Sequence, residues 1–309
     1  MIIIGAGMAG LLAGQHFRSH SPVIIENQKS LPNNHKALLR FRSEAVSDLT
    51  GIRFKKVTVH KMINYKEDHF TQSNLFLNNL YSQKVIGGVY PRSALNLEPA
   101  ERYIAPGDFI QQASNGLNIM YGMDGVIAIR EHLQKGTKTP IISTMPLSIL
   151  ASTMGYQIEQ ALETRPIMVA SFTLDIDIDV YQTVYYPNPG LELYRMSITG
   201  NKVICEFTGD PLSNFRWAQN MLVELLEFLR IDFGIITEDV SDWKYSWHKH
   251  GKLVPADQQE LQAFMGWATR EYNVYSLGRW GTHRQLLMDD VVHDLKVIDN
   301  LIHSNNYRR

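Results

Sequence analysis

Short apolar runs in the first half of the chain predict strands of a parallel sheet. Residues 2–4 (Ile-Ile-Ile) and 23–26 (Val-Ile-Ile-Glu) are two such runs, and a helix is expected between them from residue 8 to about residue 18. Residues 140–147 (Pro-Ile-Ile-Ser-Thr-Met-Pro-Leu) contain a third short strand, which ends in Ser, Thr and Pro. Apolar strands joined by helices are typical of a sheet that is buried on both faces.

The middle of the chain has a different period. From residue 167 to residue 207 polar and apolar residues alternate, and strand-like runs cover 183–186, 192–198 and 203–207. Turn residues at 187–190 and 200–201 separate these runs. The pattern predicts an antiparallel sheet, and hence a second domain. Asp175, Asp177 and Asp179 fall in the alternating stretch and are expected to form a solvated face rather than a metal site.

Several shorter signals complete the outline. Residues 52–63 are predicted to form a strand, and Pro106-Gly107-Asp108 is predicted to begin a helix. Asp210-Pro211 is expected to begin another helix, with an apolar stripe formed by Phe215, Leu222, Leu225 and Leu229. Residues 75–98 mix aromatic residues with glycine and proline, and we expect them to belong to an inserted, substrate-facing region.

Composition changes this picture little. The chain has 309 residues, which suggests two domains or one domain with an elaborate insertion, and the 44% of them that are hydrophobic support a full core. A net charge of −1 predicts no general attraction to nucleic acids or acidic membranes. Cys205 is the single cysteine, which excludes an intrachain disulfide and a Cys-x-x-Cys centre and fits a cytoplasmic location. No apolar run approaches the roughly 20 residues of a membrane span.

The turn after the first strand carries candidate chemistry. The sequence Gly5-x-Gly7-x-x-Gly10 follows the strand, opens the helix, and precedes a second strand that ends on Glu26. In a dinucleotide-binding βαβ unit the first glycine permits the tight turn, the second lets a pyrophosphate approach the backbone, and the third allows close helix packing. Helix N-terminal amides favour the phosphates, and an acid at the end of the second strand binds a ribose diol. Such a carboxylate repels a 2′-phosphate, which argues against NADP.

A second candidate segment lies near the C-terminus. An apolar strand from residue 274 leads to Gly278-Arg279, and a helix is expected to begin near residue 286, close to Met288, Asp289 and Asp290. The amides at the start of this helix could face an electron-rich part of a ligand, and Arg279 could hold an anion or a flavin edge.

Three segments together resemble the FAD-binding superfamily of amine oxidases, protoporphyrinogen oxidases and UDP-galactopyranose mutases. They are the fingerprint Gly5-x-Gly7-x-x-Gly10, residues 142–147, and the closing segment from Gly278 to Asp290. The resemblance implies FAD as the cofactor, with Gly5, Gly7, Gly10 and Glu26 on its ADP half. It also implies that Gly278, Arg279 and the turn of Met288, Asp289 and Asp290 flank the flavin. The predicted cofactor contacts also include Ala6, Met8, Ala9, Asn27, Arg42 and Thr144.

We therefore expect an α/β fold with a Rossmann-like FAD-binding domain and an inserted α+β substrate domain that contains the antiparallel sheet. The predicted FAD-binding domain comprises residues 1–60, 111–160 and 256–309, and the predicted substrate domain comprises residues 61–110 and 161–255. No second Gly-x-Gly-x-x-Gly is present for a nicotinamide domain, so the substrate itself is the expected electron donor. The hypothesis is oxidation of a C–N bond in an amine or amino-acid substrate, followed by hydrolysis of the imine.

Two basic segments supply further candidates. Residues 243–255 combine aromatic residues, lysines and histidines, and Lys252 and His250 are the predicted groups for water or proton handling. Trp247 in the same segment could stack on a planar substrate. Residues 36–61 contain seven Lys or Arg and two acids, and Arg40 or Arg42 could meet a pyrophosphate or an anionic substrate. Arg284 is a further candidate for substrate contact. No metal site is predicted.

Three alternatives remain open. The stretch Leu-Arg-Phe-Arg-Ser (39–43) is similar to small bacteriophage FAD-dependent lyases of thymine hypermodification, for which the substrate is an amino-acid adduct of a DNA base and nucleic acid is a partner. The second alternative is redox-neutral flavin chemistry of the type that the mutases carry out. Gln285 replaces the mutases' tyrosine, and Leu287-Met288 replaces their Asp-Met. The third is a carrier that shares the fold without flavin. The expected substrate is a small amine or a modified base, with no membrane partner.

Overall fold

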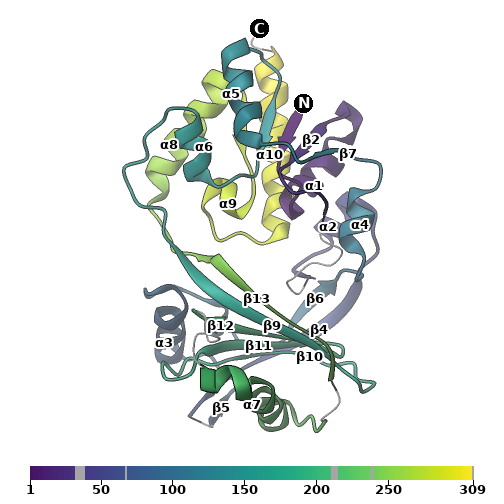
Figure 1. Cartoon of the computed structure of the whole chain (residues 1–309), viewed down its shortest axis with the longest axis vertical. Helices are drawn as coiled ribbons and strands as arrows, with labels where there is room; N and C mark the ends of the chain where they lie inside the picture. Colours follow the sequence, from purple (N-terminus) through teal and green to yellow (C-terminus); the bar gives the residue numbers. More distant parts are fainter. Residues whose placement is uncertain (32–38, 67, 210–214, 238–239, 308–309) are drawn as a thin grey trace. The chain divides into compact units, whose positions relative to one another are not determined.

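The chain divides into two compact units in a computed structural model, which describes residues 1–31, 39–66, 68–209, 215–237 and 240–307. The first unit comprises Met1–Lys56, Tyr103–Leu162 and Pro255–Arg309, and the second comprises Val57–Arg102 and Glu163–Val254. Figure 1 shows that each unit is assembled from segments far apart in the sequence.

The first unit is built around a parallel five-stranded sheet in the order β14-β8-β1-β2-β7. Ile2 of the central strand pairs with Val23 on one side and with Ile141 on the other. The predicted first, second and Pro140-flanked strands are confirmed, as is the strand from residue 274. The strand bounds are Ile2–Ile4 for β1, Val23–Glu26 for β2, Asn118–Tyr121 for β7, Ile141–Ser143 for β8 and Val274–Ser276 for β14.

Helices cover both faces of this sheet, which explains why its strands are apolar at consecutive positions. Ile3 packs into a core with helices on one face, and Ile4 packs into a separate core on the other. The first face carries α1 (Met8–His16), α2 (Ala45–Thr50), α4 (Phe109–Ser114) and α10 (Met288–Tyr307). The second carries α5 (Gly125–Lys135), α6 (Leu147–Thr153) and α8 (Gln258–Tyr272). The short helices η1 (Arg18–His20) and α9 (Gly278–Thr282) also lie in this unit.

The second unit contains a mixed sheet, in the order β13-β9-β12-β11-β10-β4. Its neighbouring strands are antiparallel except for β10 and β4, which are parallel. The strand bounds are Lys55–Tyr65 for β4, Thr164–Leu174 for β9, Tyr181–Tyr185 for β10, Leu193–Thr199 for β11, Lys202–Thr208 for β12 and Val240–Leu253 for β13. The short strand β5 (Asp68–Phe70) pairs with β4. In the first unit, Tyr103 and Ile104 at the end of β6 (Ala100–Ile104) pair with β3 (Arg40–Phe41).

Each face of this second sheet has its own core. Met168, Phe172 and Cys205 pack under α7 (Phe215–Phe233), whereas Ile167, Tyr185 and Tyr194 pack with α3 (Leu75–Ile86). A short helix η2 (Ser93–Leu95) follows α3. The alternation of Ile167 and Met168 between the two cores is the period of two that the sequence displays.

The structure confirms the predicted α/β class, and it differs from the sequence expectations in detail. The alternating run was expected to continue through Asp179, but β9 ends at Leu174. The helix α3 lies within residues 75–98, where no helix was predicted. The predicted helix start at Asp210-Pro211 and the side chain of Phe215 lie outside the described residues. Within the described ranges, no helix has both the length and the hydropathy of a membrane-spanning segment.

Candidate cofactor site

The turn between β1 and α1 is held tightly against the sheet. Gly5 has φ +93°, a left-handed conformation that favours glycine, and its amide donates to Ile25 O at 2.8 Å. A methyl group at Gly5 would lie 2.3 Å from Thr144 Oγ1, and one at Gly10 would lie 1.8 Å from Gly5 O. Two of the three fingerprint glycines are therefore required by the packing of the protein itself.

Gly7 differs from the other two glycines. It caps the N-terminus of α1 with φ −66°, which any residue adopts, and a methyl group there would meet no atom of the described residues within 4 Å. The backbone at the helix N-terminus is thus open at this one position, and its first amides lack partners within the helix. This open backbone fits a phosphate group. The packing of the described residues would allow a side chain at position 7, so glycine has an advantage over other residues there when a ligand approaches the backbone closely.

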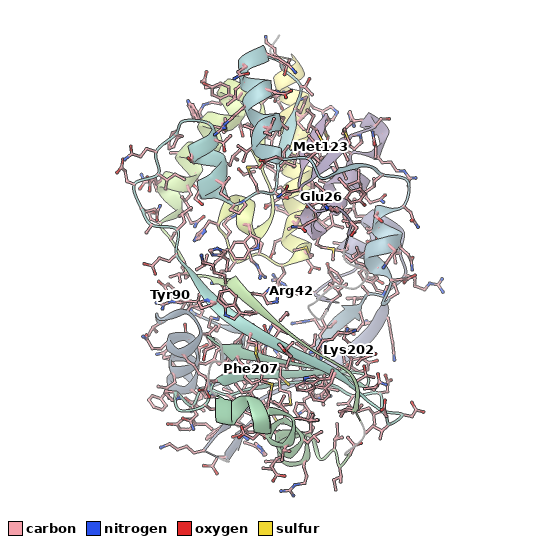
Figure 2. All side chains as sticks on the ribbon, viewed as in Figure 1. Glu26, Arg42, Tyr90, Met123, Lys202 and Phe207 are labelled. Atoms are coloured by element: carbon pink, nitrogen blue, oxygen red, sulfur yellow. The ribbon has the colours of Figure 1, made fainter. Side chains whose placement is uncertain are left out.

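Glu26 lies at the end of β2 and faces this turn. Its Oε2 accepts the Ala6 amide at 2.7 Å and its Oε1 accepts the Gln28 amide at 2.8 Å. The backbone of the same residue accepts the Met123 amide at 3.0 Å, and both residues are labelled in Figure 2. Each carboxylate oxygen can still accept one more hydrogen bond, and the exposed Asn27 follows directly in the chain.

Gly278 brings the closing segment against the first motif. Gly278 has φ +80°, and a methyl group there would lie 2.8 Å from Ala9 Cβ. Met8 is buried in the core below. Thr144 follows β8 and donates its hydroxyl to Ile4 O at 2.8 Å. The ends of β1, β8 and β14 therefore meet at one place, which is where ligands bind in doubly wound sheets.

The N-terminus of α10 is bound to residues 42 and 43. Asp289 accepts the Ser43 amide at 2.8 Å, the Ser43 hydroxyl at 2.7 Å and the Arg42 amide at 3.1 Å. Asp290 accepts the Arg42 guanidinium at 2.9 Å and the Leu287 amide at 2.7 Å. Both carboxylates suit the positive end of the helix dipole. Asp289 thus positions the backbone beside the site.

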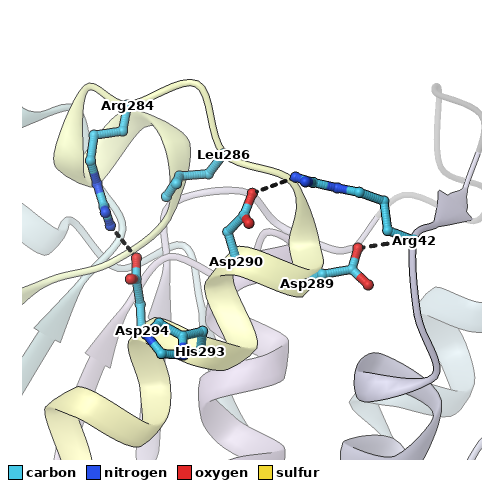
Figure 3. Close-up of a pocket in the computed structure, with 7 residues that line it drawn as sticks. All are labelled: Arg42, Arg284, Leu286, Asp289, Asp290, His293 and Asp294. Atoms are coloured by element: carbon cyan, nitrogen blue, oxygen red, sulfur yellow. Dashed lines mark hydrogen bonds and ion pairs between the residues drawn. The ribbon is translucent and has the colours of Figure 1, made fainter. Parts of the chain in front are cut away.

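A pocket of about 310 Å³ lies beside this helix. Figure 3 shows two guanidiniums directed at carboxylates of α10, with Arg42 paired to Asp290 and Arg284 paired to Asp294. Asp290 and Asp294 are four residues apart and lie on one side of the helix. Burial raises the pKa of Asp294, against the opposing effect of Arg284. The pocket is lined by Arg42, Arg284, Leu286, Asp289, Asp290, His293 and Asp294.

The remaining candidates of the closing segment have structural partners. Arg279 donates from Nη2 to Leu286 O at 3.0 Å, and this bond holds the loop that leads into α10. Met288 packs against the core at the start of the helix.

Arg40, a candidate from outside the closing segment, lies in β3, where its backbone pairs with Ile104. The pocket residues His293 and Asp294 were not singled out from the sequence. Ser43, which binds Asp289, was not singled out either, although it belongs to the noted Leu-Arg-Phe-Arg-Ser stretch.

Lys252, His250 and Trp247 belong to the second unit. Lys252 donates to Glu206 Oε1 at 3.1 Å, and His250 Nδ1 lies 2.8 Å from Thr164 Oγ1. Trp247 is 50% exposed on β13. Their proposed roles stay predictions. Sequence reasoning did not single out Glu206, although an acid inside an apolar strand is a signal of a buried ion pair. No cluster of three or more metal-ligating side chains occurs in the part of the chain that the structure describes.

The fold is shared with several solved structures. Reduced UDP-galactopyranose mutase is 12% identical and aligns with a TM-score of 0.66, covering 98% of this chain and 95% of that one. A CLA-producing fatty acid isomerase from P. acnes (12% identity, TM-score 0.57) covers 96% of this chain and 97% of its own. An oxidoreductase from Methanosarcina mazei (9% identity, TM-score 0.56) covers 97% of this chain and 99% of its own.

These likenesses confirm the predicted resemblance at the level of the fold. No protein-family model and no curated protein matches the sequence. The resemblance to the bacteriophage lyases stays a prediction.

Proposed function

We propose that this chain is an FAD-dependent oxidoreductase whose cofactor binds to the first unit. The observation that carries the proposal is the contrast among the three fingerprint glycines. Gly5 and Gly10 are required by the protein's own packing, whereas Gly7 faces open space at the N-terminus of α1. A dinucleotide explains a glycine that has open space among the described residues at the position where a pyrophosphate would approach.

The other residues divide between the two halves of the cofactor. The open backbone at Gly7 and the start of α1 would hold the pyrophosphate, and Glu26 would accept the ribose hydroxyls. Gly278, Arg279 and the start of α10 would flank the flavin, with Arg42 held nearby by Asp289 and Asp290. The second unit would then serve as the substrate domain.

The reaction that we propose is oxidation of a C–N bond in an amine or amino acid. FAD, when bound, supplies the hydride acceptor. The pocket beside α10 supports a zwitterionic or amine substrate, because it presents two guanidiniums and three carboxylates to the same small volume. Carboxylates recognise a protonated amine, and guanidiniums recognise a carboxylate.

The cofactor is tested first, by purifying the protein, adding FAD and measuring the bound flavin by its absorbance and by its identity after extraction. A protein that stays colourless and takes up no FAD would contradict the proposal and favour the carrier alternative. The reaction is tested by anaerobic mixing of the flavin-loaded protein with amines and amino acids. Bleaching of the flavin is the expected result, and its absence with every candidate would contradict amine oxidation.

Redox-neutral flavin chemistry is the second candidate. The observation that favours it is the match in fold to UDP-galactopyranose mutase over nearly the whole of both chains. The two candidates differ in their need for reduction. A redox-neutral enzyme would require dithionite-reduced flavin for each reaction, whereas an oxidase would use the oxidised flavin and then oxygen.

A further inference from the structure

A buried carboxylate on the second sheet holds two cations. Glu206 of β12 is 7% exposed, and it accepts hydrogen bonds from Tyr194 OH at 2.9 Å, from Lys252 Nζ at 3.1 Å and from Arg195 Nε. Arg195 and Glu206 are register partners on neighbouring strands. Burial works to raise the pKa of Glu206, but the two cations outweigh it and lower the pKa to about 2. Glu206 is therefore ionised at neutral pH.

Only one edge of the Arg195 guanidinium is used by this network. Its Nε–H points at Glu206, whereas the two Nη groups have no hydrogen-bond partner among the residues that the structure describes. The side chain is 33% exposed, so these donors are accessible to a ligand. A guanidinium presents its donors in a fixed planar fork that matches a carboxylate or a phosphate.

The surroundings limit the motion of this guanidinium. Tyr194 is fully buried beside it, and the ring of Tyr81 lies 6.1 Å from that of Tyr194 and 5.2 Å from that of Tyr185. Tyr185 is the other register partner of Arg195. The strand and the tyrosine rings thus fix the base of the side chain, and Glu206 fixes the Nε edge. A donor fork held in this way loses little entropy when it binds an anion.

The local charge also favours an anion. Lys252 and Arg165 are register partners on β13 and β9, so two cationic side chains stand opposite each other. Like charges in this arrangement destabilise a sheet. Arg195 and Lys252 both contact the buried carboxylate of Glu206, so two cations share a single anion there. An anionic ligand would offset this repulsion.

We propose that the Nη edge of Arg195 binds a carboxylate or phosphate group of the substrate. Binding of the anion does not depend on the flavin. Its identification as part of the substrate rests on the proposed function.

The test uses the full-length, FAD-loaded protein and two probes, inorganic phosphate and acetate, titrated separately by calorimetry at low ionic strength. Arg195→Gln is compared with the native protein and with Lys202→Gln. Lys202, labelled in Figure 2, is an exposed lysine at the start of β12, so its substitution removes the same charge from the strand next to that of Arg195. We expect Arg195→Gln to weaken anion binding by about tenfold or more and Lys202→Gln to change it by less than about twofold.

The outcomes separate the possible sources of the anion. Binding of acetate alone indicates a carboxylate substrate, binding of phosphate alone indicates a phosphorylated one, and binding of both indicates a general anion site. Equal affinity of the Arg195→Gln and native proteins, or no binding of either probe, would overturn the proposal. Flavin content is measured on the same samples, so that a colourless protein that still binds the anion contradicts only the proposed function.

A second variant covers the case in which Arg195→Gln does not fold. Arg195→Lys keeps the positive charge beside Glu206 but lacks the planar fork. It is expected to keep the far-ultraviolet circular dichroism of the native protein and to weaken anion binding by several-fold. A lysine variant that binds the anions as tightly as the native protein would contradict the assignment to the Nη edge.

Discussion

Ser43 and Asp289 are joined by two hydrogen bonds across 246 positions of the chain, from the Ser43 amide at 2.8 Å and from its hydroxyl at 2.7 Å to the same carboxylate oxygen. The other oxygen accepts the Arg42 amide. The start of α10 is thereby tied to the segment that carries Arg42, so two parts of the candidate cofactor site are positioned by one side chain.

Asp289→Asn is expected to weaken FAD binding by about tenfold while leaving the fold intact. The amide nitrogen of asparagine cannot accept a hydrogen bond. Either the Arg42 amide or the two Ser43 donors therefore lose their acceptor on residue 289. The measurement is the dissociation constant of FAD, from the change in flavin fluorescence on titration. The matched control is Asp257→Asn, at the N-cap of α8, where the carboxylate holds the Gln259 amide at 3.0 Å. Equal losses in both variants would indicate a general destabilisation instead.

The fingerprint glycines are expected to respond differently to the same substitution. Gly7→Ala places a methyl group in open space on an unstrained backbone, so stability should be equal or slightly higher, while FAD affinity falls at least about tenfold. Gly10→Ala drives a methyl group into Gly5 O and should lower the free energy of unfolding by about 3 kcal/mol or more. Chemical denaturation of the flavin-free proteins and FAD titration separate the two effects. FAD binding by Gly7→Ala as tight as that of the native protein would argue against a pyrophosphate at this position.

The parts of the fold that could be predicted are those whose signals are local. One such signal lies within the first ten residues, where the apolar run of Ile2, Ile3 and Ile4 indicates a strand. The glycines that follow it indicate a tight turn. The helix α3 was not predicted. Its first turn exposes Leu75 and Phe76, at 64% and 62%, so its apolar positions do not repeat on one face.

The candidate sites were harder to predict because their partners are set by strand register and by long-range packing. Lys252 was singled out from a basic segment, but its partner Glu206 lies 46 positions away and is brought near it across β9. Arg42 was a candidate for the cofactor, yet its pairing with Asp290 spans 248 positions. Neither separation follows any local period, because the first is set by the register of neighbouring strands and the second by the packing of α10 in the core of the first unit.

Glu206 is expected to make stability depend on pH in acid. Its pKa is lowered to about 2 in the folded protein, whereas the model-peptide value for glutamate is about 4.3. The unfolded chain therefore binds more protons between these values, and the stabilisation is complete above about pH 5 and lost as the pH falls toward 2. The loss is expected to be about 3 kcal/mol.

Urea unfolding between pH 5 and pH 2 measures this effect in the native protein and in Glu206→Gln. The variant should be less stable near neutral pH and should lose less stability on acidification. Glu131→Gln removes an exposed glutamate of α5 and serves as the control. Identical acid dependence in the native and Glu206→Gln proteins would contradict the depressed pKa.

Lys84 is expected to produce a second pH dependence, at the alkaline side of neutrality. This half-buried lysine of α3 donates to Tyr186 O and Leu193 O, both at 2.7 Å, and burial lowers its pKa to about 7, against the effect of Glu192. The unfolded chain keeps the proton up to about pH 10.4, so it binds more protons than the folded protein above pH 7. Stability contributed by this site should therefore rise between pH 7 and pH 10, by on the order of 3 kcal/mol.

Lys84→Met isolates that contribution, because methionine fills a similar volume without a titrating group. The variant leaves two carbonyls without their donor, so it should be less stable than the native protein by about 2 kcal/mol at pH 7. The gap should widen toward pH 10, because only the native protein gains stability as the lysine loses its proton. Lys135→Met, which removes an exposed lysine of α5, should follow the native pH profile. Thermal or urea unfolding of the three proteins across this range gives the comparison. Parallel profiles for Lys84→Met and the native protein would show that Lys84 keeps an ordinary pKa in the folded state.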